Sequence, residues 1–117
     1  MSRILIALHG HSIRRSVLNA VFDYCRKMRF KVSVLLVDEA DAPSPALADF
    51  LARLKHAGLN GRLHRQAGCL GQAVLEFASR HKDISLILVD SMKNWGGGVP
   101  LKALSPPVGL FSGIVAT

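Results

Sequence analysis

The chain has 117 residues, of which half are hydrophobic, and a formal net charge of +7 with histidine neutral. This length suits one domain, which we expect to span 1–117, and no apolar run approaches the roughly 18 residues needed to span a bilayer. No small-residue cleavage site follows the first apolar stretch, so we predict a soluble, cytoplasmic protein. The two cysteines, Cys25 and Cys69, fit neither a redox pair nor a zinc spacing, and we expect both to be reduced and buried.

The first third of the chain reads as strand, helix and strand. Residues 3–8 form an apolar run that stops at Gly10, and Ser12 is placed to cap a helix. Residues 30–37 then predict a largely covered second strand. Between them, apolar residues recur at helical spacing and mark one buried helix face: Ile13, Val17, Leu18, Val21, Tyr24, Cys25 and Met28.

The middle of the chain repeats this alternation. After a proline-containing break at 41–45, a second helix is expected to end near Gly58. Residues 62–66 are polar for a strand, which places them at an edge of the sheet. A third helix follows over 70–80, and 84–91 has the sequence of the most clearly buried strand.

The last part of the chain is less regular. Residues 92–107 predict an irregular connection with one helical turn at 101–104, and 108–115 predict a final strand. Strands that alternate with helices imply parallel, right-handed crossovers. We therefore predict an α/β fold with an open, mainly parallel five-stranded sheet flanked by helices and a shortened C-terminal region.

Three segments in this order resemble a universal stress protein domain, which has an adenine nucleotide alpha hydrolase-like fold. His9-Gly-His-Ser12 occupies the loop where that family usually shows Asp-Gly-Ser, directly after the opening strand. Residues 68–78 are similar to the family's glycine, short spacer and Ile-Leu-x-x-Ala helix, and 84–91 fall where it writes Ala-Asp-Leu-Ile-Val-Val-Gly-Ser. The resemblance implies a regulatory or stress-signalling domain that forms a homodimer through its terminal strand.

The chain also departs from the family at the nucleotide loops. Asp90 stands where a strand-end glycine is expected, and His9 replaces an acidic residue that contacts the nucleotide. In the family, the loop after the fourth strand carries Gly-x-x-Gly, nine further residues and then Gly-Ser or Gly-Thr. This chain has only the glycines at 96–98 and a separate Ser105, with too few residues for the helix that usually lies between. The resemblance therefore implies a divergent member with weakened or lost adenine-nucleotide binding.

A nucleotide such as ATP or AMP, if bound, is expected where these loops meet. Glycines let backbone amides approach phosphate, although a glycine run also serves as a flexible connector. We expect these residues to orient a ligand rather than transform it, so we predict no catalytic and no metal-binding residue. The predicted nucleotide-binding residues are His9, Gly10, His11, Ser12, Val37, Gly96, Gly97 and Gly98.

Two alternative functions remain open from the residues themselves. A protein-interaction module would use the basic cluster of Arg26, Lys27, Arg29 and Lys31, although cations there also complement the dipole of the first helix. Nucleic acid is not the expected partner, because only seven aromatic residues are present and none interleaves with the basic ones.

The second alternative is a phosphocarrier. His9 followed by Gly10, with Asp90 and Trp95 after a later strand, resembles the mannose-type sugar phosphotransferase A domains. His9 would then accept the phosphoryl group and Asp90 would orient it, but a complete strand and helix over 59–82 make the span too long. Trp95 itself is expected either to cover a bound base or to pack over the end of the sheet.

Overall fold

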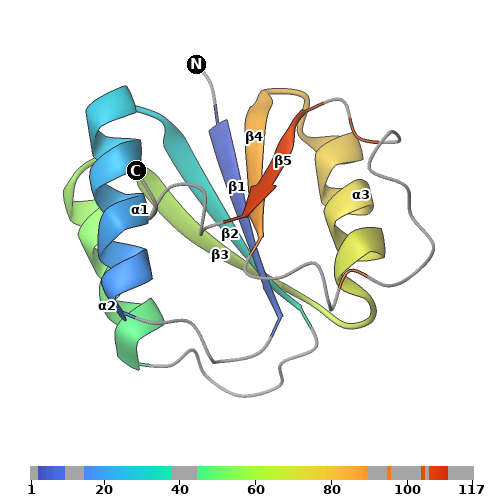
Figure 1. The fold of residues 1–117 in the computed structure, drawn as a ribbon, viewed down its shortest axis with the longest axis horizontal. Coiled ribbons are helices and arrows are strands. Elements are labelled where there is room, and N and C mark those ends of the chain that lie inside the picture. Colours follow the sequence, from blue (N-terminus) through green and yellow to red (C-terminus); the bar gives the residue numbers. More distant parts are fainter. Residues whose placement is uncertain are drawn as a thin grey trace.

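The computed structural model describes residues 3–9, 15–37, 45–89, 95, 104 and 106–110. They form one five-stranded sheet in the order β3-β2-β1-β4-β5, and every neighbouring pair is parallel (Figure 1). The predicted fold class is confirmed, including the polar strand at an edge. The strands are β1 (Arg3–His9), β2 (Lys31–Val37), β3 (Asn60–Gln66), β4 (Ile84–Val89) and β5 (Val108–Leu110).

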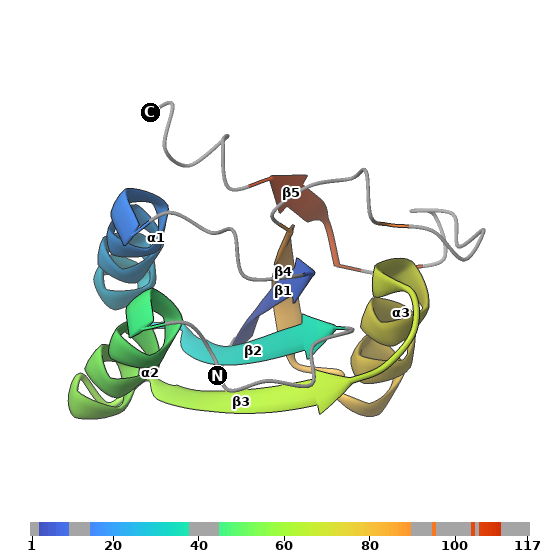
Figure 2. The ribbon, with the colours of Figure 1, turned by 90° about the horizontal axis from the view of Figure 1, so that it is seen from below.

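The three helices of the described residues cover both faces of the sheet, because parallel neighbours require a crossover from one edge of the strands to the other. Helices α1 (Arg15–Met28) and α2 (Pro45–His56) lie side by side on one face, and α3 (Leu70–Arg80) lies on the opposite face (Figure 2). Within the described ranges, no helix is both long and apolar enough to cross a membrane.

The most deeply buried strands are β1 and β2, whereas the sequence predicted that residues 84–91 would form the most clearly buried strand. Residues 32–37 of β2 are all buried, whereas β4 exposes Ser85 and only partly buries Leu86. The reason is the outer neighbour, because β3 pairs along β2 from Val32 to Val37, whereas β5 pairs with β4 only over Ile87–Val89. Ser33 is buried inside β2, where its Oγ accepts a hydrogen bond from Arg3 Nη1 at 2.6 Å.

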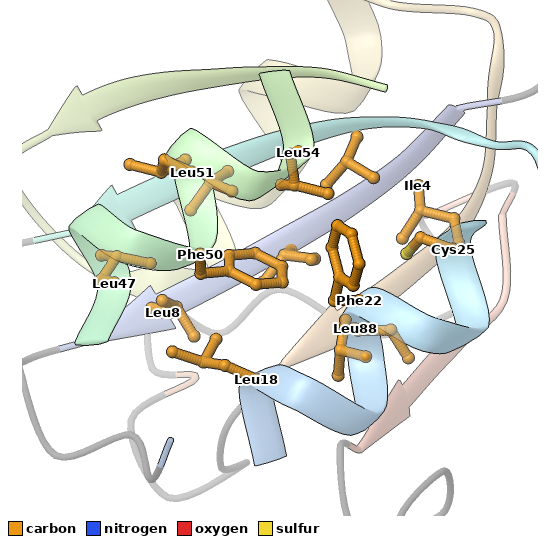
Figure 3. Packing of buried hydrophobic residues seen from close by; sticks show 14 of the residues in the cluster. Ile4, Leu8, Leu18, Phe22, Cys25, Leu47, Phe50, Leu51, Leu54 and Leu88 are labelled. Atoms are coloured by element: carbon orange, nitrogen blue, oxygen red, sulfur yellow. The ribbon is translucent and has the colours of Figure 1, made fainter. Parts of the chain in front are cut away.

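The larger core lies between the sheet and helices α1 and α2 (Figure 3). Ile4, Ile6 and Leu8 of β1 face it, as the two-residue period of a strand requires. The helical spacing correctly predicted the buried Leu18, but two positions on α1 differ from the expectation. Phe22 is buried against this core, whereas Met28 in the last turn is 51% exposed because the chain turns away there toward β2.

Helix α2 ends as predicted. Gly58 has φ +75°, its N–H bonds the Lys55 carbonyl at 3.1 Å, and the Leu59 N–H bonds the Leu54 carbonyl at 2.9 Å. This pair of bonds is a Schellman ending, which needs a left-handed residue after the helix. The chain enters β3 through Gly61, where an added Cβ would lie 2.8 Å from Leu54 Cβ, so only glycine fits between α2 and the sheet.

The second core lies on the other face and includes two residues from the long connection between β4 and β5. Leu70, Val74 and Phe77 of α3 pack with Trp95 and Leu104, which are each 8% exposed. The connection therefore contributes to the same hydrophobic layer as α3. Of the predicted helical turn at 101–104 only Leu104 lies within the described residues, and of the predicted strand 108–115 only 108–110 do.

The sequence predicted two buried cysteines, but only one of them is buried. Cys25 is buried in the larger core, and this burial raises its thiol pKa to about 12, so the thiol stays protonated. Cys69 is exposed because it precedes the first turn of α3, at the N-cap position, instead of facing the sheet.

His64 of β3 packs edge-on against Phe77 of α3, with the ring centroids 4.8 Å apart. His81 stacks on Phe77, with the ring centroids 4.1 Å apart, and its centroid lies 6.2 Å from that of His64. Burial lowers the pKa of His64, and the nearby charges of His81, Arg62 and Arg3 lower it further. Its buried Nε2 has no hydrogen-bond partner among the described residues.

A lowered His64 pKa makes folding stability depend on pH. The unfolded chain binds a proton near pH 6.5 more readily than the folded chain does, so stability should be complete above that pH and decline as the pH falls through it. We expect urea unfolding to show a larger loss of stability from neutral to mildly acidic pH in the wild type than in His64→Leu. The exposed His56→Leu should keep the wild-type pH dependence, and an identical dependence in His64→Leu would contradict the assignment.

Candidate functional site

The carboxyl ends of β1, β2 and β4 form one edge of the sheet. His9 pairs with Val37 across β1 and β2, and Ala7 pairs with Val89 across β1 and β4. β1 thus continues two residues past its last partner in β4. The loop after β1 and the connection after β4 leave from the same edge, as the sequence predicted, and ligands of open α/β sheets bind beyond such an edge.

The floor under this edge is apolar and closed. Ala7, Val37 and Val89 are fully buried, and they belong to one cluster with Leu70 at the start of α3. Val37 therefore lies where the sequence predicted a nucleotide contact, but its side chain supports the floor from within. Ala7, Val37 and Val89 therefore offer a ligand at this edge no exposed side chain.

Trp95 is fixed at the beginning of α3. The Gly71 N–H donates to the Trp95 carbonyl at 2.6 Å. A Cβ on Gly71 would lie 2.8 Å from Trp95 Nε1 and 2.9 Å from the Trp95 carbonyl oxygen, so residue 71 must be glycine for this contact. Of the two expectations for Trp95, packing over the end of the sheet is the one observed.

This contact matters for the site because Trp95 directly precedes Gly96. The N-terminal turn of a helix offers free backbone N–H groups. One of these groups, that of Gly71, is already used to hold the Trp95 carbonyl, so the start of α3 fastens the connection after β4. Sequence reasoning missed this pairing, although a glycine in the first turn of a helix and a lone tryptophan in a glycine-rich stretch were its two visible signals.

A set of polar side chains joins the end of β3 to α3. Gln66, which pairs with Val37, donates from Nε2 to Glu76 Oε2 at 2.5 Å, and Gln72 Nε2 donates to Glu76 Oε1 at 3.3 Å. Glu76 thus uses both carboxylate oxygens in bonds within the protein. In the ranges that the structure describes, no three His, Cys, Asp or Glu side chains gather to hold a metal ion.

Most of the predicted nucleotide-binding residues lie outside the described residues: Gly10, His11, Ser12, Gly96, Gly97 and Gly98. Val37 is placed fully, and His9 is placed by its backbone at the end of β1. Asp90, the partner of His9 in the phosphocarrier alternative, also lies outside these ranges. The structure therefore brings together the strand ends that would carry the two loops.

Comparisons with known proteins agree with this geometry. No family model and no curated protein matches the sequence. The fold is similar to a universal stress protein family structure from Burkholderia pseudomallei, with 19% identity, TM-score 0.60, and 93% of this chain and 94% of that one covered. A universal stress protein from Archaeoglobus fulgidus gives 17% identity, TM-score 0.61, and 94% and 93% coverage.

A third solved structure, a universal stress protein in complex with cAMP, covers 93% of this chain and 95% of its own at 9% identity and TM-score 0.55. The three similarities extend over nearly the whole of each chain and rest on shape rather than on sequence. The chain has the universal stress protein fold.

Proposed function

We propose that this chain is a regulatory domain of the universal stress protein type in which the adenine-nucleotide site is weakened or lost. The observation that supports it most directly is the parallel pairing of β1 with both β2 and β4, which starts the two predicted loops from one edge. The fastening of Trp95 to Gly71 adds to this, because it holds the residue before the glycine run at the start of α3.

The chemistry of the loops favours weak binding. Backbone amides in a glycine run suit phosphate, and a related fold is known in complex with cAMP. His9, however, stands where the family resemblance implies an acidic residue that contacts the nucleotide, and it cannot supply the charge-assisted hydrogen bond that a carboxylate accepts. The proposed ligand is ATP or AMP held loosely and not hydrolysed.

Restoring an acidic residue should strengthen binding. We expect calorimetric titration of the wild type with ATP, ADP and AMP to give weak saturable binding, and native mass spectrometry of the fresh protein to show no retained nucleotide. His9→Asp should tighten ATP binding about tenfold, the value of one charge-assisted hydrogen bond. Gly10→Val and Gly97→Val should weaken it.

The matched control is His56→Asp, which makes the same exchange on α2 and should leave ATP affinity unchanged. Complete absence of binding in both the wild type and His9→Asp would remove the nucleotide part of the proposal. An equal gain in His56→Asp would show a general charge effect instead of a site.

The contact between Gly71 and Trp95 can be tested separately. Gly71→Ala forces a Cβ against the Trp95 indole and carbonyl, and such overpacking costs about 1–3 kcal/mol. We expect urea unfolding to show that loss of stability, and tryptophan fluorescence, which reports the single Trp95, to shift to longer wavelength. Gly58→Ala meets no atom within 4 Å but strains a left-handed backbone, so it should also lose stability while its fluorescence stays unchanged.

We further propose that the domain forms a homodimer through β5, which is an edge strand of the sheet. The Pro107 carbonyl accepts a hydrogen bond from the Ile87 N–H at 2.9 Å, so residues 107 and 109 direct their polar groups toward β4. By the alternation of a strand, Val108 directs its N–H and C=O toward the open edge. An open edge of this kind is a template for pairing with another chain.

Removing the Val108 N–H, which points away from β4, should separate the dimer. We expect light scattering after size exclusion to give a dimer for the wild type and a monomer for Val108→Pro, with unchanged circular dichroism. Gly109→Ala, whose Cβ would meet Leu88 at an ordinary 3.6 Å, should remain dimeric. A wild-type monomer, or a Val108→Pro dimer, would contradict this assembly.

A further inference from the structure

A basic groove lies between α1 and α2 at the end of the molecule opposite the candidate nucleotide site. One hollow of about 470 Å³ is lined by Phe22 and Arg26 of α1 and by Arg53 and His56 of α2. A second, of about 400 Å³, continues from Arg26 and Ala57 to Arg29, Lys31 and Leu59. The two hollows share Arg26 and Ala57, and we call them together the basic groove.

Aromatic and amide contacts hold two of its cations in place. The Arg53 guanidinium lies 4.3 Å from the centre of the Phe22 ring, and its Nη1 donates to Asn19 Oδ1 at 2.6 Å. The Arg26 guanidinium lies 5.8 Å from the same ring. Figure 3 shows Phe22 placed between the two helices. A guanidinium that is already ordered loses less entropy when it binds an anion.

None of the cations that line the groove forms an ion pair with a carboxylate of the described chain. The ion pairs within these ranges are elsewhere, joining Arg3 to Asp83, Arg15 to Asp49 and Arg80 to Glu76. The cluster therefore presents positive charge that the described residues leave unneutralised.

Arg29 has a left-handed backbone conformation, which costs free energy for a residue other than glycine. It has φ +56°, and it closes α1 with bonds from its N–H to the Arg26 carbonyl at 3.3 Å and from the Phe30 N–H to the Cys25 carbonyl at 3.2 Å. This is the same helix ending that α2 makes with Gly58, where glycine is the favoured residue. Stability alone would favour glycine at residue 29, so the arginine points to a use for its charge.

We propose that the basic groove binds an acidic peptide segment of a partner protein. The hollows combine cationic walls with the exposed methyl groups of Ala52 and Ala57, which suits a segment that carries both carboxylates and apolar side chains. Single-stranded nucleic acid, by contrast, uses exposed aromatic rings to stack its bases, and Phe22 is only 7% exposed. The site is independent of the nucleotide proposal, because Lys31 and Val37 lie at opposite ends of β2, about 20 Å apart.

The test is fluorescence anisotropy of the full chain with a labelled short peptide in which leucine and glutamate alternate. We expect saturable binding at low salt that weakens as salt rises. Arg26→Gln and Arg53→Gln should each weaken binding about fivefold, whereas Arg62→Gln, an exposed arginine on β3 outside the groove, should leave it unchanged. The same peptide with glutamine in place of glutamate should not bind.

Arg29→Gly separates a binding role from a structural one. It should raise the melting temperature, since glycine suits the left-handed position, and at the same time weaken peptide binding about threefold. If the cluster had only a structural role, Arg29→Gly would change stability and peptide binding in the same direction or leave both unchanged. The proposal is overturned if the peptide does not bind at low salt, if Arg62→Gln weakens binding as much as Arg26→Gln, or if single-stranded DNA or anionic vesicles bind more tightly than the peptide.

Discussion

The structure depends on β1 lying between β2 and β4 and running parallel to both. Arg3 fastens this arrangement at the amino end of the strand, because its Nη1 bonds Ser33 of β2 and its Nε bonds Asp83, just before β4, at 3.1 Å. Slight burial would raise the pKa of Asp83, but the hydrogen bond and charge of Arg3 outweigh it and lower that pKa. With the register fixed at one end, the other end of the same three strands becomes a single edge from which two loops leave.

On the face of the sheet opposite α1 and α2, residues of the connection between β4 and β5 complete the hydrophobic core. β5 runs parallel to β4, so the chain must return across the sheet between them. Trp95 and Leu104 from that connection are buried in the cluster that α3 also covers. The large aromatic ring of Trp95 buries much apolar area, and Gly71 provides the room for it. The same contact that completes the core also holds the residue that precedes Gly96.

The sequence was most informative where burial follows a local period. Continuous apolar runs predicted β1 and β2, and the polar run at 62–66 correctly predicted an edge strand. The contacts that the sequence did not predict join residues far apart in the chain. Arg3 bonds Ser33 from the neighbouring strand, and Trp95 meets Gly71 across 24 residues of sequence. No window along the chain contains both members of either pair.

The same limit applies to the candidate site. The order of the elements predicted which strand ends meet, and the pairing of His9 with Val37 confirms that part. The burial of Val37 could not be read from its type, because an apolar residue at a strand end contacts a ligand or the core according to what packs beside it. Leu70 and Trp95 pack in the same cluster and make it part of the floor.

The two ends of the sheet differ in charge for a reason that belongs to the fold. Parallel strands place the N-termini of all three helices at one edge and their C-termini at the other, so the helix dipoles favour anions at the carboxyl edge and cations at the amino edge. Arg26 and Arg53, in the last turns of α1 and α2, satisfy this preference. Arg29 directly follows α1, where the same dipole favours a cation, but it has a left-handed conformation that glycine adopts at lower cost. Dipole complementarity therefore explains why cations gather at this edge, but it does not explain why one of them stands at a position whose backbone conformation favours glycine.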